Sequence, residues 1–113
     1  MIVTIYHNPR CSKSRKTLAI LEEKGIKPNI IEYLIQPVSF SEIKRILSII
    51  GRPPREILRV KDAKDENIDI DSLSESDLIK AIIKYPRILE RPIVVIGEKA
   101  VLCRPPENVL KIL

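Results

Sequence analysis

The apolar residues of this chain follow two patterns. Short β-branched runs at positions 2–6, 27–33, 92–96 and 100–103 are typical of strands. Between the second and third runs, apolar residues recur every three or four positions, as in amphipathic helices. A strand, a helix and a second strand at the start, with a hairpin near the end, predict an α/β fold with a mixed sheet.

Capping residues set the limits of the predicted helices. Ser39 with Glu42 three positions later forms a capping box, and Gly51 closes the helix that follows. A helix after Cys11 ends at Gly25. Three shorter helices, each opened by Ser or Pro, are predicted at positions 53–58, 74–85 and 105–113. Positions 61–71 are predicted to form a charged loop.

The two last runs predict a hairpin of defined register. Gly97 at the first central position of a two-residue turn favours type II′, which pairs Ile96 with Lys99. Residues whose numbers sum to 195 then face each other, so that Pro92 faces Cys103 and Arg91 faces Arg104. A three-residue turn would shift this register by one. About 5% of X–Pro bonds are cis, so a cis Arg91–Pro92 bond is a minority expectation.

Length and charge restrict the kinds of protein that this chain can be. A chain of 113 residues builds one core, so we expect a single domain over 1–113. The net charge of +5 comes from 20 basic and 15 acidic residues with few aromatic ones, and nucleic-acid binding is therefore not expected. We see neither a membrane span nor an export signal, and two cysteines make no disulfide framework. These features predict a soluble, cytoplasmic protein.

Cys11 lies where its thiol should ionise. It follows the first strand and precedes a helix, whose backbone N–H groups would point at the sulfur. Four cations surround it in sequence without a carboxylate: Arg10, Lys13, Arg15 and Lys16. Both effects lower a cysteine pKa toward roughly 3.5 to 7.5. The alternative is a small buried hydrophobe, which is our interpretation of Cys103.

Arg91 and Arg104 form the second candidate for chemistry. Two arginines directly opposite each other repel, unless an anion lies between them. A guanidinium matches the geometry of an oxyanion better than an ammonium does. The pair therefore predicts an oxyanion site, with two solvated end-of-strand arginines as the alternative.

These segments together resemble a known family. The order of elements looks like the thioredoxin fold, a four-stranded mixed sheet flanked by helices with a helical insertion before the C-terminal hairpin. The segments Tyr-His-Asn-Pro-Arg-Cys-Ser-Lys-Ser-Arg at 6–15, Arg-Pro-Ile-Val-Val at 91–95 and Leu-Cys-Arg-Pro at 102–105 resemble the glutaredoxin-coupled arsenate reductases, which are related to Spx-like proteins.

The resemblance implies a mechanism for arsenic detoxification. Cys11 would attack arsenate, and Arg59, Arg91 and Arg104 would bind the oxyanion. His7 would help to keep the thiolate ionised, although packing in the turn or an exposed hydrogen bond is an equal alternative. Ser14, Arg15 and Pro92 are expected to support the site. Glutathione would serve as co-substrate and glutaredoxin as partner, with no bound cofactor.

Other functions stay open at this point. The site is Cys11-x-x-Ser14, so no resolving cysteine is at hand and an external thiol must complete turnover. One alternative is a glutathione-dependent reductase of another substrate. Another is an Spx-like regulator that binds RNA polymerase, whose switch is typically Cys-x-x-Cys. No metal site is predicted, because the acidic stretch at 65–76 lacks the glycine and the glutamate of a calcium loop.

Overall fold

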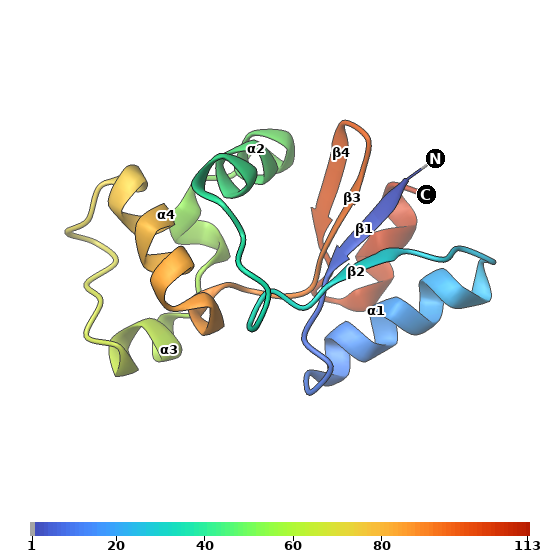
Figure 1. Ribbon diagram of the computed structural model, residues 1–113, viewed down its shortest axis with the longest axis horizontal. Coiled ribbons are helices and arrows are strands. Elements are labelled where there is room, and N and C mark those ends of the chain that lie inside the picture. Colours follow the sequence, from blue (N-terminus) through green and yellow to red (C-terminus); the bar gives the residue numbers. More distant parts are fainter. Residues whose placement is uncertain (1) are drawn as a thin grey trace. The chain divides into compact units, whose positions relative to one another are not determined.

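The computed structural model describes residues 2–113 and divides into two compact units, Met1–Gln36 with Arg91–Leu113, and Pro37–Glu90 (Figure 1). Each unit is described by itself. The first unit holds both cysteines, the single histidine and the terminal segments of the chain.

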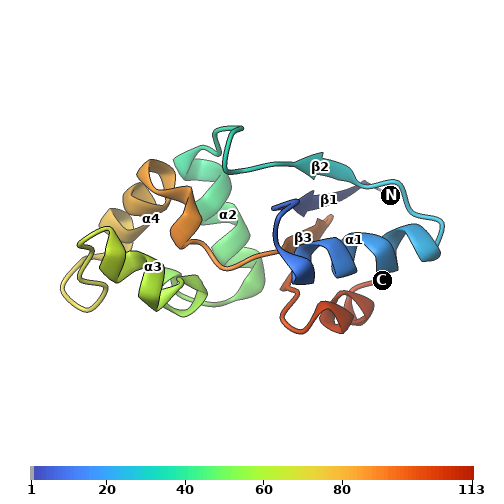
Figure 2. The same ribbon diagram turned by 90° about the horizontal axis from the view of Figure 1, so that it is seen from below.

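The first unit is a four-stranded mixed sheet in the order β2-β1-β3-β4. The central strand β1 (Val3–Tyr6) runs parallel to β2 (Asn29–Ile31) and antiparallel to β3 (Ile93–Ile96), which pairs with β4 (Lys99–Leu102). Helix α1 (Ser12–Glu23) and the 3₁₀ helix η3 (Pro106–Lys111) lie on one face of the sheet (Figure 2). This is the predicted thioredoxin-like arrangement, although β2 is shorter than the apolar run at 27–33.

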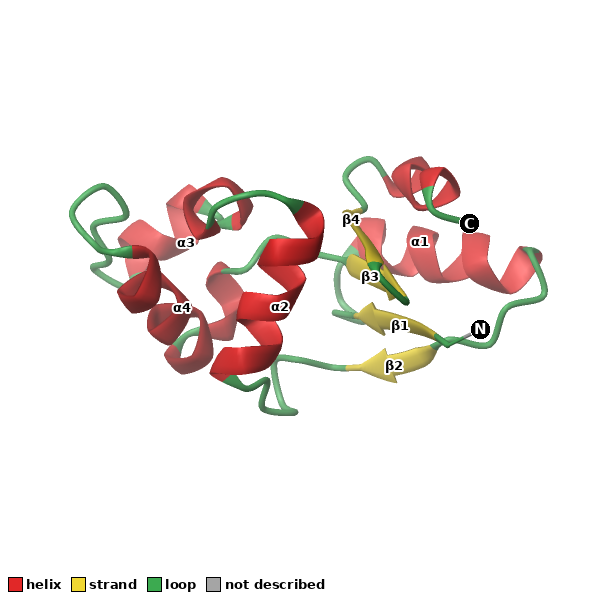
Figure 3. Ribbon diagram, turned by 90° about the horizontal axis from the view of Figure 1, so that it is seen from above, coloured by secondary structure: helices red, strands yellow, loops and turns green. Residues whose placement is uncertain are grey.

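The core of this unit lies between the sheet and its two helices (Figure 3). It is built from alternate residues of the central strands, because successive side chains of a strand point to opposite faces. The members that are buried are Val3, Ile5, Leu21, Val94, Ile96, Cys103 and Val109. Cys103 is fully buried among these apolar side chains, which confirms that it is a packed residue.

The hairpin has the predicted register. Ile96 pairs with Lys99 and Ile93 with Leu102, and the N–H of Cys103 donates to the carbonyl of Pro92 at 2.9 Å. Gly97 adopts a φ of 58°, which suits the first central position of a type II′ turn. The Arg91–Pro92 bond is cis. The Arg104–Pro105 bond is also cis, and no sequence pattern had indicated it.

The second unit is helical and corresponds to the predicted insertion. Its two longer helices, α2 (Phe40–Ile50) and α4 (Glu75–Lys84), each bury one apolar face. The predicted capping box is confirmed, since the N–H of Glu42 donates to the Ser39 hydroxyl at 3.2 Å, and Gly51 closes α2 at a φ of 75°. The shorter helices are η1 (Pro54–Ile57), α3 (Val60–Asp65) and η2 (Pro86–Ile88).

The predicted charged loop at 61–71 is partly wrong. Its first half is helix α3, with Arg59 as the N-cap residue. This helix has six residues and buries only Ala63, so its sequence carries too few apolar positions to show a helical period. Asp62 in the first turn suits the positive end of the helix dipole. Within residues 2–113, no helix has both the length and the apolar character that crossing a bilayer requires.

Candidate active site

Cys11 lies at the turn from β1 to α1 and is the N-cap residue of that helix. Its own N–H donates to the carbonyl of Asn8 at 3.0 Å, and its carbonyl accepts the N–H of Arg15 at 3.0 Å. The side-chain oxygen of Asn8 accepts the N–H of Arg10 at 3.0 Å, which holds the turn from the other side. The sulfur is half-buried, so a small reagent can reach it.

The pKa of the Cys11 thiol is lowered from its ordinary value. Partial burial raises this pKa, but hydrogen bonds from the N–H groups of Ser14 and Lys13 and from the Arg91 side chain together outweigh that effect. The predicted thiolate is thus supported, as is the predicted contribution of the helix N–H groups, but the source of the positive charge is different. The cation that acts on the sulfur is Arg91, and Arg15 instead donates to the carbonyl of Pro9 at 3.0 Å.

His7 and Ser14 form a buried pair beneath the cysteine turn. The Nδ1 atom of His7 lies 2.6 Å from the Ser14 hydroxyl, which also accepts the N–H of Asn8 at 3.1 Å. Burial lowers the pKa of His7, with Glu32 opposing and Arg15 reinforcing the shift. The lowered pKa favours the neutral form of His7 near pH 7. The role expected of His7 in keeping the Cys11 thiolate ionised stays a prediction.

The open end of the hairpin brings the two facing arginines to this site. Besides the contact of Arg91 with Cys11, the guanidinium of Arg104 donates through Nη1 to the carbonyl of Arg91 at 3.0 Å. Pro92, which follows, is fully buried. Cys11 therefore contacts the side chain of Arg91, and Arg104 binds the backbone of Arg91, all within the first unit.

Cys103 offers no second nucleophile. Its sulfur is fully buried and lies 3.7 Å from the carbonyl of Val101. Burial raises its pKa to about 12, against the opposing hydrogen bonds of the Thr17 side chain and the Val94 N–H. A thiol in this state does not ionise near neutral pH.

Arg59 belongs to the second unit. Its N–H donates to the carbonyl of Ile88 at 2.6 Å, beside an isolated bridge between Leu58 and Leu89. Its guanidinium contacts Asp62 through Nε at 2.5 Å and Glu90 at 3.6 Å. Nothing in its local sequence marks Arg59 as a site residue, and only the family resemblance singles it out.

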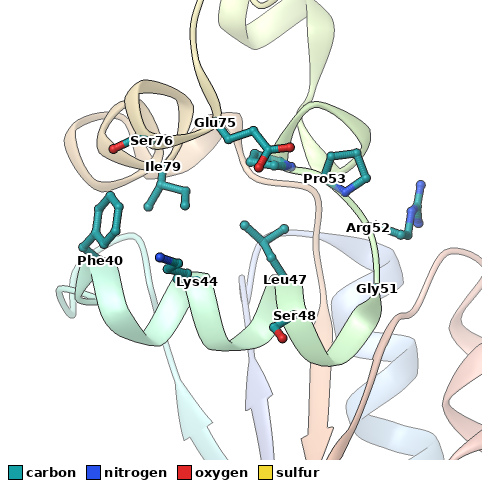
Figure 4. Close-up of a pocket in the computed structure, with 11 residues that line it drawn as sticks. Phe40, Lys44, Leu47, Ser48, Gly51, Arg52, Pro53, Glu75, Ser76 and Ile79 are labelled. Atoms are coloured by element: carbon teal, nitrogen blue, oxygen red, sulfur yellow. The ribbon is translucent and has the colours of Figure 1, made fainter.

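A hollow in the second unit differs in character from this site. It has a volume of about 680 Å³, and its lining includes the apolar Phe40 and Leu47 of α2, Ile79 of α4, and the charged Lys44, Arg52 and Glu75 (Figure 4). Its lining contains neither cysteine nor histidine. Among residues 2–113, no group of His, Cys, Asp and Glu side chains is arranged to hold a metal ion.

Comparisons with known proteins agree with this geometry. Residues 6–112 match the profile of the ArsC family. The chain is 47% identical to an arsenate reductase of Haemophilus influenzae over the full length of both, and 47% identical to the uncharacterized protein YfgD of Escherichia coli over 97% of this chain and 95% of that one. The structure of the arsenate reductase from Vibrio cholerae superimposes with a TM-score of 0.94 at 44% identity, covering 100% of this chain and 98% of that one.

Proposed function

This chain belongs to the ArsC family, and we propose that it reduces arsenate to arsenite with Cys11 as the nucleophile. One observation carries the proposal. The half-buried Cys11, with its lowered pKa, contacts the side chain of Arg91, and Arg104 binds the Arg91 carbonyl. A thiolate held beside guanidinium groups is suited to attack a tetrahedral oxyanion. The relatives named arsenate reductase support arsenate as that substrate.

The first step that we propose forms a bond between the Cys11 sulfur and arsenic. One arsenate oxygen leaves as water, and the guanidinium groups offset the charge of the remaining oxygens. Arg91 and Arg104 serve this role from the first unit. The family resemblance alone suggests Arg59 as a further oxyanion-binding residue.

The two electrons that reduce arsenic come from the sulfur of Cys11 and from one external thiol. A second thiol attacks the adduct, arsenic is reduced from As(V) to As(III), and the two sulfur atoms join in a disulfide. The balance is one arsenate and two thiols in, one arsenite, one disulfide and one water out. Because Ser14 stands where a resolving cysteine would be and Cys103 is buried, we propose glutathione as the second thiol and glutaredoxin as the protein that reduces the mixed disulfide. This chemistry suits a reducing cytoplasm.

The test is a coupled assay with glutathione, glutaredoxin, glutathione reductase and NADPH. We expect NADPH consumption that requires arsenate and glutathione and that glutaredoxin accelerates. Cys11→Ser should abolish it, whereas Cys103→Ser, the matched control, should keep most of the activity.

Mass spectrometry after one turnover without glutaredoxin identifies the thiol that is joined to Cys11. We expect glutathione attached to Cys11. A disulfide between Cys11 and Cys103 would overturn the external-thiol mechanism. If the protein reduces other disulfides with glutathione and NADPH consumption does not respond to arsenate, it is a reductase of another substrate.

A further inference from the structure

Asn8 lies in the turn between β1 and α1, where its residue surface is only 7% exposed. A buried amide must find hydrogen-bond partners, and Asn8 finds them in the residues that follow it. Its N–H donates to the Ser14 hydroxyl at 3.1 Å, and its carbonyl accepts the N–H of Cys11 at 3.0 Å. Its side-chain Oδ1 accepts the N–H of Arg10 at 3.0 Å. Asn8 is therefore bonded to the nucleophile, to the residue before it and to the helix after it.

Residues 8–11 form a tight turn that Asn8 closes twice. The bond from the Cys11 N–H to the Asn8 carbonyl joins the two ends of the turn. Asn at the first position and Pro9 at the second favour such a turn, because proline already has the φ that the second position needs. The Asn8 side chain bonds the N–H two residues along the chain, which is an Asx turn within the larger one. One residue thus fixes the turn through its main chain and through its side chain.

The turn brings Cys11 to the start of α1 in an extended conformation. Cys11 is the N-cap residue with a φ of −91° and a ψ of 123°, and its carbonyl accepts the N–H of Arg15 at 3.0 Å. The side chain of an N-cap residue faces the N–H groups of the second and third helical residues, here Lys13 and Ser14. These are the N–H groups that stabilise the Cys11 thiolate. Their effect on the sulfur therefore depends on the conformation in which the turn holds Cys11.

Ser14 joins the turn to the helix a second time. Its N–H acts on the Cys11 sulfur, while its hydroxyl accepts the N–H of Asn8. Within residues 2–113, the hydrogen bonds of Asn8 all end on residues 10–14. A change of the Asn8 side chain should therefore disturb residues 8–14 and leave the pairing of the sheet in place. A role in the general stability of the fold would need contacts beyond this segment.

The Asn8 side chain is therefore more important for the direction of the sulfur than for the fold. Without Oδ1, the Arg10 N–H loses its acceptor and the turn keeps only one of its two closures. The backbone at Cys11 then gains freedom, and the sulfur leaves the N–H groups of α1 for part of the time. Hydrogen bonds weaken steeply as their angle departs from linear, so a small rotation is sufficient.

We infer that Asn8 is a positioning residue for the nucleophile, because its side chain closes the turn that sets Cys11 at the start of α1 with the sulfur against the helix N–H groups. Asn8 acts through the backbone of Cys11. The inference deepens the proposed function, and rests on it to the extent that the reaction uses this thiolate. The direction of the sulfur can nevertheless be measured without arsenate.

Alkylation of Cys11 by iodoacetamide against pH, followed by mass spectrometry in the full chain, tests this role. Asn8→Ala removes the side-chain acceptor, and Asn8→Gln keeps a buried amide but moves its oxygen one carbon further away. In both variants we expect the midpoint of the profile to shift to higher pH. The rate at pH 7 should fall roughly 2- to 5-fold, since the loss of thiolate is partly offset by its greater nucleophilicity. Asn8→Ser keeps an oxygen that can accept the Arg10 N–H and should stay close to the wild type.

Ser39→Ala is the matched control, because it also removes a side-chain acceptor of a backbone N–H, that of Glu42 at the start of α2. It should leave the alkylation profile unchanged. An unchanged midpoint in Asn8→Ala and Asn8→Gln, or an equal shift in the control, would overturn the inference. Circular dichroism shows which variants are folded, and one folded variant of the two is sufficient. If neither folds, Asn8 is a structural residue and the inference is wrong.

The coupled arsenate assay adds a pH profile of turnover. For Asn8→Ala, kcat/KM should be lowered at pH 7 and should return toward the wild-type value at pH 9, where the thiol ionises without help from the turn. A loss of the same size at both pH values would contradict the positioning role. A wild type that does not reduce arsenate would refute the proposed function alone, because the alkylation profile would still decide for or against Asn8.

Discussion

At the cysteine turn, the sequence predicted one cause of the lowered Cys11 pKa correctly, the N–H groups of the helix start, and the other, the charged group, incorrectly. The run of cations around Cys11 suggested a thiolate stabilised by its neighbours in sequence. In the structure, the stabilising groups are two backbone N–H groups of α1 and the side chain of Arg91, which lies 80 positions along the chain. The contribution of Arg91 depends on the fold and leaves no trace in the local sequence.

The first residue-scale prediction concerns Arg91. Arg91→Met should raise the pKa of Cys11, because it removes a hydrogen bond and a positive charge from the thiolate. Lys16→Met, the control within the local cation run, should shift it much less. The rate of alkylation of Cys11 against pH, followed by mass spectrometry, measures both. Equal shifts in the two variants would restore the local-cation interpretation.

The second residue-scale prediction concerns His7, the only histidine of the chain. Its pKa is lowered by folding, so below about 6.5 the unfolded chain binds a proton that the folded chain does not. As the pH falls from about 6.5 toward the folded pKa of His7, protonation of this residue in the unfolded chain should lower the free energy of unfolding. Above about pH 6.5, His7 should make no pH-dependent contribution to the free energy of unfolding.

Urea unfolding of the wild type and of His7→Gln at pH 7.5 and pH 5.5 measures this contribution. The wild type should lose more free energy of unfolding between these two values than the variant does. A wild type and variant that respond identically to pH would show that His7 titrates alike in the folded and unfolded states.

At the scale of elements, sequence patterns predicted most of the fold. Period and capping residues located α1, α2, α4 and the hairpin, because each has several apolar positions or a defined cap. Helix α3 was missed, because its six residues bury a single alanine and its first turn depends on Arg59 and Asp62. Short helices of this kind are stabilised by tertiary contacts rather than by their own sequence.

The element-scale prediction concerns the β3–β4 turn. Gly97 has a φ of 58°, and a Cβ built there would meet no heavy atom within 4 Å outside its chain neighbours. Gly97→Ala should therefore lower the free energy of unfolding by about 1 to 2 kcal/mol through backbone conformation alone. Gly97→Asn should cost less, because Asn tolerates this region better. Urea unfolding compares the two, and an equal cost would point to a steric cause.

At the scale of the whole chain, the candidate site draws on segments that are far apart in sequence. Cys11 could be predicted from its own surroundings, and Arg91 with Arg104 from the register of the hairpin. The pairing of His7 with Ser14 and the bond from Arg104 to the Arg91 carbonyl could not, because both depend on side-chain orientation within the fold. Arg59 came only from the family resemblance, and the carboxylates around it came only from the structure.

The burial of Cys103 also has a practical consequence. The folded chain presents thiol-reactive compounds with one accessible sulfur, at the turn that leads into α1. A dye, a spin label or a maleimide-coated surface would thus attach at a single defined point. The native protein can be tethered in one orientation without any engineered cysteine, at the cost of its proposed nucleophile.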